Sequence, residues 1–136
     1  MSKKRVLFLC VGNTCRSQMA EAIVNSRFGD QWEAFSAGSH PGEAVNPLAL
    51  QALEEIGISH CGRPKSVEQF RHVSLNQVVI LCDQDDAECP VWLGKGKVLV
   101  HPYPDPARET GSDEQKQSAY RSVRDRMLKE IPALLP

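Results

Sequence analysis

Short apolar runs alternate along the chain with longer segments in which apolar residues recur every three or four positions. The runs predict four strands, at residues 4–9, 32–37, 78–81 and 97–100. In the first of them, Val6 to Leu9 is unbroken, which is typical of a strand buried on both faces of a parallel sheet. Strands that alternate with helices form a parallel, doubly wound sheet. We therefore expect an α/β fold with four parallel strands flanked by helices.

Helical periodicity predicts three helices and one short turn, at residues 19–28, 46–56, 112–131 and 66–70. The ends of these segments carry helix signals. Gly29 and Gly57 stand where glycine commonly closes a helix. Asn46 is a cap residue followed by a proline suited to the first turn. Ser112 with Gln115 forms a capping box.

Composition is that of an ordinary globular protein, with 41% hydrophobic and 24% charged residues. No repeat or linker divides the chain, so residues 1–136 are expected to form one domain. Sixteen basic and seventeen acidic residues give no field that favours nucleic acid. The apolar run after the basic N-terminus is too short for a signal peptide or a membrane span. We expect a monomeric, cytoplasmic protein, in which five cysteines indicate metal binding or redox catalysis.

The first strand and the first helix are joined by the loop Cys10-Val11-Gly12-Asn13-Thr14-Cys15-Arg16-Ser17. Gly12 and Asn13 tolerate unusual backbone angles, so successive N–H groups can point at one spot, where the helix also aims its positive end. Arg16 adds a planar fork of donors that suits a tetrahedral oxyanion. This positive potential favours Cys10 as a thiolate nucleophile. Cys15 is either a small residue that fits or a thiol that pairs with Cys10 on oxidation.

The alternative interpretation of this loop is a buried cysteine at a strand end and a solvated arginine. The strand before it, the turn within it and the amphipathic helix after it make that coincidence the weaker interpretation. A nucleotide-binding loop fits poorly, because no Gly-Lys-Ser/Thr triplet ends this one. The sequence therefore predicts an oxyanion cradle with a sulfur nucleophile.

Two further reactive residues lie at the ends of predicted strands. Cys82 ends the third strand and Asp105 follows the fourth. Ligands of parallel sheets bind at the carboxyl ends of the strands, so Cys10, Cys82 and Asp105 are expected along one edge. Cys82 and Cys89 flank an acidic segment and could be small residues beside a turn, a zinc site or a redox pair. Zinc is disfavoured by the wide gap and the lack of a nearby histidine.

The segment CVGNTCRSQMAE at residues 10–21 resembles the active-site loop of the low-molecular-weight protein tyrosine phosphatases and of the arsenate reductases built on the same fold. The resemblance covers nearly the whole chain. It implies that Cys10 is the nucleophile, Arg16 clamps the oxyanion, Ser17 hydrogen-bonds the thiolate and Asn13 holds the shape of the loop. The remaining members of the oxyanion-binding loop are Val11, Gly12, Thr14 and Cys15.

The rest of the chain favours the reductase branch. Cys82 and Cys89 resemble the cysteine pair of thioredoxin-coupled arsenate reductases, which the phosphatases generally lack. An aspartate before a proline is usually only a turn, but Asp105-Pro106 resembles the general acid of both branches. Ala107 stands where phosphatases typically carry an aromatic residue.

The resemblance thus implies reduction of arsenate, with phosphate or sulfate as related oxyanions. Cys10 attacks arsenic while Asp105 protonates the departing hydroxide. Cys82 then attacks Cys10 and releases arsenite, Cys89 moves the disulfide to Cys82–Cys89, and a thioredoxin reduces it. The alternatives are a tyrosine phosphatase that uses Cys10, Arg16 and Asp105, and a redox or oxyanion sensor without turnover.

Some arsenate reductases of this type bind potassium beside the loop. Asn13, Glu21 and Ser36 match positions of that site, but Lys65 stands where an acidic ligand is needed. Its ammonium can take the place of the cation, so we expect no metal and no cofactor. Cys61 and the four histidines are expected to have no catalytic role.

Helix formers and acidic residues fill the segment between Cys82 and Cys89, so we expect it to be partly helical when reduced. Seven residues of helix rise about 10.5 Å, whereas a disulfide needs Cα atoms about 4.4–6.8 Å apart. Oxidation should therefore unwind this segment.

Overall fold

The computed structural model describes residues 3–83 and 85–135. The elements in chain order are β1 (Lys4–Cys10), α1 (Arg16–Arg27), β2 (Trp32–Gly38), α2 (Pro47–Glu54), η1 (Val67–Phe70), β3 (Gln77–Ile80), β4 (Lys97–Val100), η2 (Pro106–Arg108) and α3 (Asp113–Leu134). All the predicted strands and helices are present.

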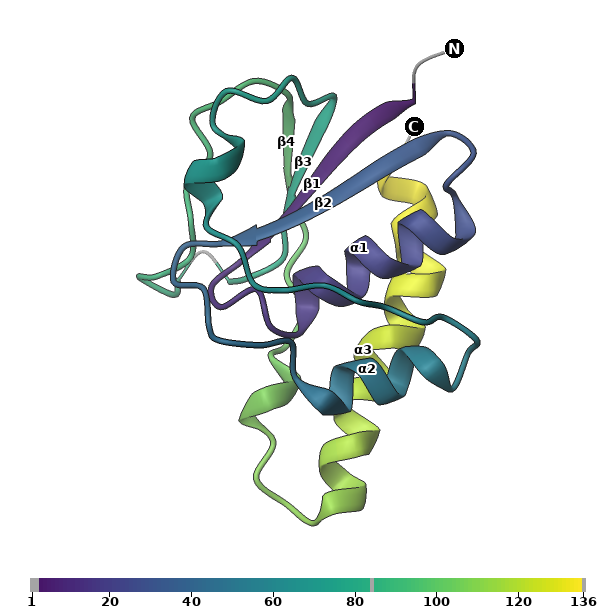
Figure 1. Ribbon diagram of the computed structural model, residues 1–136. Helices are drawn as coiled ribbons and strands as arrows, with labels where there is room; N and C mark the ends of the chain where they lie inside the picture. The colour runs from purple at the N-terminus through teal and green to yellow at the C-terminus, as the bar shows by residue number, and fades with distance from the viewer. Residues whose placement is uncertain (1–2, 84, 136) are drawn as a thin grey trace.

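The strands form one parallel sheet in the order β2-β1-β3-β4 (Figure 1). Leu9 of β1 lies opposite Ala37 of β2 and Ile80 of β3. This register aligns the carboxyl ends of the central strands at one edge of the sheet. The predicted α/β fold with four parallel strands is therefore confirmed.

The sheet separates two hydrophobic cores of different construction, because successive residues of β1 point to opposite faces. Val6 and Phe8 enter the helix-side core, where they pack with residues of α1, α2 and α3 such as Met19, Leu53, Tyr120 and Met127. Leu7 and Leu9 enter the loop-side core, with Val67, Phe70, Val78, Ile80, Cys82 and Trp92.

The two faces of the sheet are covered unequally. The three α-helices lie on one side, whereas the short 3₁₀ turn η1 and irregular loops lie on the other (Figure 1). The expected doubly wound arrangement, with helices on both faces, is therefore wrong, because the connections on the second face are irregular loops. On the edge strand β4, Val98 and Val100 remain 41% and 46% exposed. Within the described part of the chain, no helix has the length and apolar character needed to cross a membrane.

The helix ends largely follow the sequence signals. The Asn46 side chain accepts a hydrogen bond from the N–H of Leu48, and the capping box at the start of α3 is formed. Gly57 takes a φ of +81° after α2, as a closing glycine does. Gly29 differs: α1 ends at Arg27, and a Cβ at Gly29 would lie 2.5 Å from the carbonyl oxygen of Asn25. Close packing, rather than a left-handed φ, explains this glycine.

Candidate active site

The loop between β1 and α1 is held by its carbonyl groups. The carbonyl oxygens of Val11, Gly12 and Thr14 accept hydrogen bonds at 2.8, 3.0 and 3.0 Å from backbone N–H groups in the segment 40–46. Since the C=O and N–H of a trans peptide point in opposite directions, the N–H groups that follow face the inside of the loop. Gly38 permits this packing, because a Cβ there would collide with the Val11 carbonyl oxygen. The result is a nest of N–H groups suited to an anion.

Cys10 lies at the floor of this nest and is 2% exposed. Its Sγ atom is 3.2 Å from the backbone N of Asn13 and 2.8 Å from Oγ of Ser17. The Ser17 oxygen accepts a hydrogen bond from Nδ2 of Asn13 at 2.7 Å, so its own proton is directed at the sulfur. The Cys10 sulfur is therefore held by an N–H and an O–H group at the floor of the nest, where a bound oxyanion would meet it.

Asn13 connects the loop to its surroundings. It is fully buried and has a φ of 55°, in the left-handed region. Its Oδ1 accepts hydrogen bonds from Nε2 of Gln18 at 3.1 Å and from the backbone N of Lys65 at 2.8 Å. With the bond to Ser17, the side chain spans three partners. These contacts are what a residue that fixes the shape of the loop requires.

A polar layer behind the loop has no counterpart in the sequence predictions. Gln18 is fully buried on α1, donates to the Arg63 carbonyl at 3.0 Å and lies 2.7 Å from Nε2 of His60. Burial lowers the pKa of His60, against the opposing effect of the Glu21 carboxylate. The one sequence signal was a glutamine on the buried side of an amphipathic helix.

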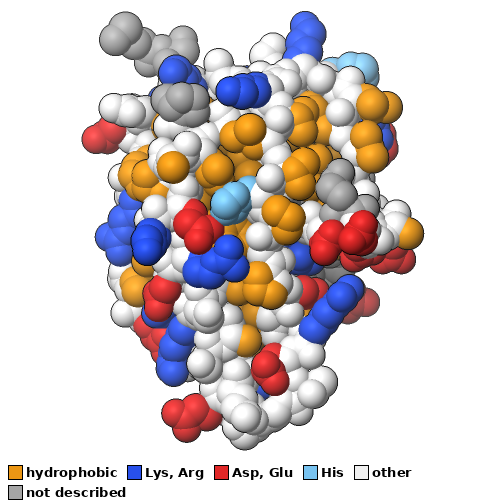
Figure 2. Space-filling model, turned by 180° about the vertical axis from the view of Figure 1, so that it is seen from behind, with side chains coloured by type: hydrophobic (Ala, Val, Ile, Leu, Met, Phe, Trp, Pro, Cys, Tyr) orange, Lys and Arg blue, Asp and Glu red, His pale blue; other side chains and the backbone are white. Residues whose placement is uncertain are grey.

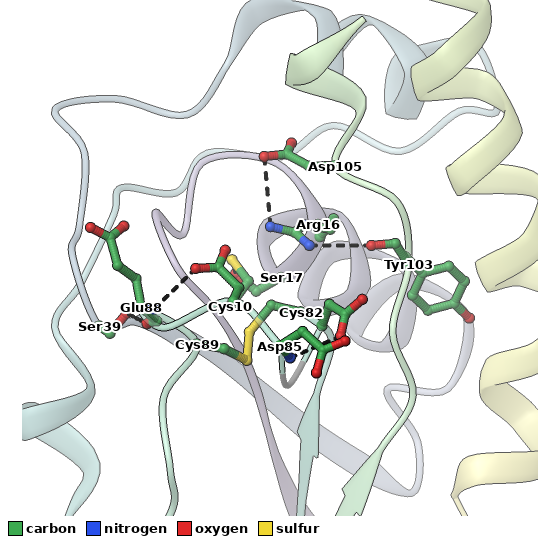
Figure 3. The surroundings of a disulfide bond; sticks show 12 residues. Cys10, Arg16, Ser17, Ser39, Cys82, Asp85, Glu88, Cys89, Tyr103 and Asp105 are labelled. Atoms are coloured by element: carbon green, nitrogen blue, oxygen red, sulfur yellow. Dashed lines mark hydrogen bonds and ion pairs between the residues drawn. A yellow bond between two sulfur atoms is a disulfide. The ribbon is translucent and has the colours of Figure 1, made fainter.

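Arg16 and Asp105 face each other at the cradle. Arg16 is 8% exposed, its Nη1 donates to the Tyr103 carbonyl at 3.2 Å, and its Nη2 lies 3.7 Å from Oδ2 of Asp105 (Figure 3). Oδ1 of Asp105 accepts a hydrogen bond from the N–H of Ala107 at 3.0 Å, which fixes the carboxylate at the start of η2. Asp105 thus reaches the nucleophile loop from beyond the fourth strand.

Cys82 and Cys89 form a disulfide with their Cα atoms 5.9 Å apart. Cys82 is fully buried and Cys89 is half-buried. Of the described residues between them, none is helical; the N–H of Asp86 bonds to the carbonyl of Asp83, and the N–H of Cys89 to that of Asp86, both at 3.0 Å. These turns are what the oxidation argument predicts, while position 84 lies outside the described residues. A disulfide also excludes the zinc interpretation for this state.

The disulfide lies beside the cradle. The N–H of Leu81 donates to the carbonyl of Leu9 at 2.8 Å, which ties the ends of β1 and β3 together. Cys10 and Cys82 therefore leave adjacent strands at the same edge, near Asp105 (Figure 3). The convergence expected from the strand ends is present.

A cavity of about 230 Å³ opens above Cys10. Beyond the loop itself, its lining residues are Asp86, Glu88, Asp105 and Arg108. No aromatic side chain is among the described residues that line it. Trp92 is buried in the loop-side core, and Tyr103 is buried against the helices. This opening suits a small oxyanion better than a phenyl ester.

Cys15 is a buried thiol, 3% exposed, with its Sγ 3.5 Å from the hydroxyl oxygen of Tyr120. Burial raises the pKa of Cys15, which keeps the thiol neutral. These contacts favour the interpretation of Cys15 as a small packed residue. Cys61 is an exposed free thiol.

The potential cation site contains a lysine side chain. Oγ of Ser36 donates to Oε1 of Glu21 at 3.0 Å, and Nζ of Lys65 lies 3.8 Å from the same oxygen. The ammonium therefore lies against the carboxylate that would face a cation. Across residues 3–83 and 85–135, no group of three or more His, Cys, Asp or Glu side chains could hold a metal ion.

Comparison with known sequences gives a consistent picture. Residues 5–135 match the family described as low molecular weight phosphotyrosine protein phosphatase. The arsenate reductase of Halalkalibacterium halodurans is 38% identical over 132 residues, which cover 96% of this chain and 94% of that protein. The arsenate reductase of Bacillus subtilis is 35% identical over 126 residues, with 92% and 90% covered.

Solved structures share the fold. An arsenate reductase in a phosphate-binding state has a TM-score of 0.74 at 26% identity, with 96% of this chain and 95% of that chain covered. A low molecular weight protein tyrosine phosphatase from T. tengcongensis has a TM-score of 0.74 at 26% identity, with 98% of each chain covered. Proteins named for reduction and for phosphate-ester hydrolysis thus share this architecture.

Proposed function

The chain belongs to the low molecular weight phosphotyrosine protein phosphatase family, and on that premise we propose that it is an arsenate reductase. Its relatives at 35% and 38% identity carry that name. The observation that carries the proposal is the Cys82–Cys89 disulfide beside the oxyanion cradle. Ester hydrolysis on this fold needs a nucleophile, an arginine and an acid, but neither of these two cysteines.

The first half of the reaction is attack on arsenic. The Cys10 thiolate, held by Asn13 and Ser17, forms an S–As bond while an As–O bond breaks. Asp105 donates a proton to the departing hydroxide, which leaves as water. The inward N–H groups and Arg16 stabilise the negative charge on the remaining oxygens. Arsenic is still As(V) in this adduct.

The second half transfers two electrons. The Cys82 thiolate attacks Sγ of Cys10, an S–S bond forms, and the electron pair of the S–As bond stays with arsenic, which leaves as arsenite. The Cys89 thiolate then attacks Cys82 and releases Cys10. The thiol pattern of the structure, with free Cys10 and bonded Cys82–Cys89, is the pattern of this end state.

A dithiol must return two electrons and two protons to the Cys82–Cys89 pair, and we assign this role to a thioredoxin. The cytoplasm is the compartment proposed, because Cys10, Cys15 and Cys61 are free thiols that a reducing environment preserves. A monomer suffices, since every residue of the cradle comes from one chain.

The test is an arsenate turnover assay with thioredoxin, thioredoxin reductase and NADPH, run beside p-nitrophenyl phosphate hydrolysis. We expect arsenate-dependent NADPH oxidation and at most slow hydrolysis. Cys82→Ser should abolish steady-state reduction but keep the slow hydrolysis, whereas Cys10→Ser should abolish both. Cys61→Ser is the matched control, because this exposed thiol lies outside the cradle and should behave as wild type.

Reduction of arsenate by Cys82→Ser at the wild-type rate would contradict the three-cysteine scheme. Efficient ester hydrolysis by the wild type without arsenate reduction would support the tyrosine phosphatase instead, with Cys10, Arg16 and Asp105 as its machinery. Disulfide formation on addition of arsenate without turnover would support a sensor.

A further inference from the structure

We propose that Arg108 recruits the oxyanion at the mouth of the cradle, and that Asp86 neutralises Arg108 while the Cys82–Cys89 disulfide is closed. This inference rests on the proposed oxyanion chemistry of the site. Arg108 ends η2, its side chain is 77% exposed, and it lines the cavity above Cys10.

Arg108 occupies the rim shared by two hollows. The cavity of about 230 Å³ above Cys10 and a neighbouring hollow of about 390 Å³ are both lined by Arg16, Asp86, Asp105 and Arg108. Of the described residues that line the first cavity, Arg16 and Arg108 are the basic ones. Arg16 is buried within the loop, so Arg108 is the cation that an approaching anion meets first.

The present partners of Arg108 hold it weakly. Its Nη2 lies 3.6 Å from Oδ2 of Asp86, and its Nε lies 3.9 Å from Oδ2 of Asp105. Both separations exceed the roughly 2.7–2.9 Å of a charge-assisted hydrogen bond. Exposed ion pairs of this kind contribute little to stability. The pair with Asp86 therefore depends on the turn that positions Asp86, and Arg108 can leave Asp86 for an oxyanion once that turn opens.

The disulfide controls where Asp86 lies. Asp86 sits in the turn that Cys82 and Cys89 close, and its Oδ1 accepts a hydrogen bond from the N–H of Glu88 at 3.0 Å. The Glu88 carbonyl in turn accepts a hydrogen bond from Oγ of Ser39, which fastens the turn to the loop after β2. The acidic side chains of this turn gather at one edge of the molecule, next to basic side chains (Figure 2).

The closed turn makes the mouth of the cradle acidic. Three carboxylates, of Asp86, Glu88 and Asp105, face two guanidinium groups, of Arg16 and Arg108. These carboxylates weaken the attraction that the N–H groups of the loop and the two guanidinium groups exert on an oxyanion. When a dithiol breaks the S–S bond, adding two electrons and two protons, the turn is released and Asp86 no longer holds Arg108. The enzyme thus accepts its reductant before its next oxyanion.

Phosphate titrations followed by calorimetry test this assignment on oxidised protein and on protein reduced with a phosphine. In the reduced protein, Arg108→Ala should weaken phosphate binding about tenfold, as expected for loss of one partly screened charge contact. Arg108→Lys should keep most of the affinity. Arg71→Ala is the control, because Arg71 is a half-exposed arginine that also forms an i,i+3 pair, with Glu68, and lines neither hollow. Its affinity should match wild type.

The dependence of phosphate binding on the Cys82–Cys89 disulfide is tested separately. Wild-type protein should bind phosphate more weakly when oxidised than when reduced, and Asp86→Asn should make the two affinities more similar. In arsenate kinetics, Arg108→Ala should raise KM with little change in kcat. Equal phosphate affinities for Arg108→Ala and Arg71→Ala would overturn the proposal, as would equal affinities of oxidised and reduced wild type. Loss of arsenate turnover with intact, Arg108-dependent phosphate binding would instead refute only the proposed reductase function.

Discussion

Replacing Asn13 by alanine should both destabilise the protein and disable Cys10. The side chain donates one hydrogen bond, to Ser17 at 2.7 Å, and accepts two, from Gln18 at 3.1 Å and from the backbone of Lys65 at 2.8 Å. After the substitution, Ser17 keeps its contact with the cysteine sulfur and Gln18 keeps its bond to the carbonyl of residue 63. The N–H of Lys65 loses the acceptor that Asn13 supplied.

The magnitude follows from these contacts. The hydrogen bonds of Asn13 with Ser17 and with Gln18 contribute about 1 kcal/mol each, and the N–H of Lys65, left without a partner, costs about 1–3 kcal/mol. An alanine at a φ of 55° adds about 1–2 kcal/mol of backbone strain. Asn13→Ala should therefore lower the free energy of unfolding by about 4–7 kcal/mol, a large part of the roughly 5–15 kcal/mol of a typical domain. Asn13→Gly loses the same contacts without the strain, so its loss of unfolding free energy should be smaller by about 1–2 kcal/mol.

Urea denaturation and the coupled arsenate assay measure the two effects. Asn76→Ala is the control: its Oδ1 accepts one exposed hydrogen bond from the N–H of Arg5 at 2.7 Å, at the opposite end of the sheet. It should cost about 1 kcal/mol or less and leave turnover unchanged. If Asn13→Ala unfolds at the same urea concentration as Asn76→Ala and keeps full turnover, the central role of Asn13 is refuted.

Three other outcomes are expected. Asp105→Asn should lower kcat for arsenate by about 10²–10⁴-fold, as for loss of a general acid, while iodoacetamide still alkylates Cys10 at the wild-type rate; an unchanged kcat contradicts the role. Burial lowers the pKa of His60 in the folded protein, so the unfolded chain takes up this proton first, and the free energy of unfolding should fall as pH drops below about 6.5. Urea titrations of His60→Gln should show a smaller fall in this free energy than those of the wild type, and an equal fall argues against the role of His60. Amide exchange across residues 83–89 should differ between reduced and oxidised protein, and equal protection, with the disulfide verified by mass spectrometry, contradicts the expected rearrangement.

The four strands could be predicted because each is a short apolar run, and the three helices because their apolar residues recur every three or four positions. The boundary of β3 shows where this signal ends. The predicted strand began at residue 78, but β3 begins at Gln77, which is 2% exposed and donates its side-chain amide to the carbonyl of Leu134. Gln18 escaped notice for the same reason. A buried polar residue that a distant partner satisfies interrupts the apolar pattern, so the pattern alone does not show that the residue is buried.

The strand-end rule was enough to bring together Cys10, Cys82 and Asp105, because a parallel sheet aligns those positions whatever the loops do. The mouth of the cradle was beyond such reasoning. Arg108 and Asp86 meet at 3.6 Å from different loops, and only the paths of those loops decide their approach. Sequence patterns describe regular elements well and say little about how irregular segments fold over them.

The unequal covering of the sheet has an evolutionary consequence. The nucleophile loop connects β1 to α1, and α1 packs in the helix-side core, whereas the cysteine pair occupies the loop-side core and the turn above it. Acquisition or loss of the pair therefore leaves the helices and their core intact. On this scaffold the same cradle can therefore serve ester hydrolysis or oxyanion reduction, according to whether Cys82 at the end of β3 and Cys89 in the turn after it are present.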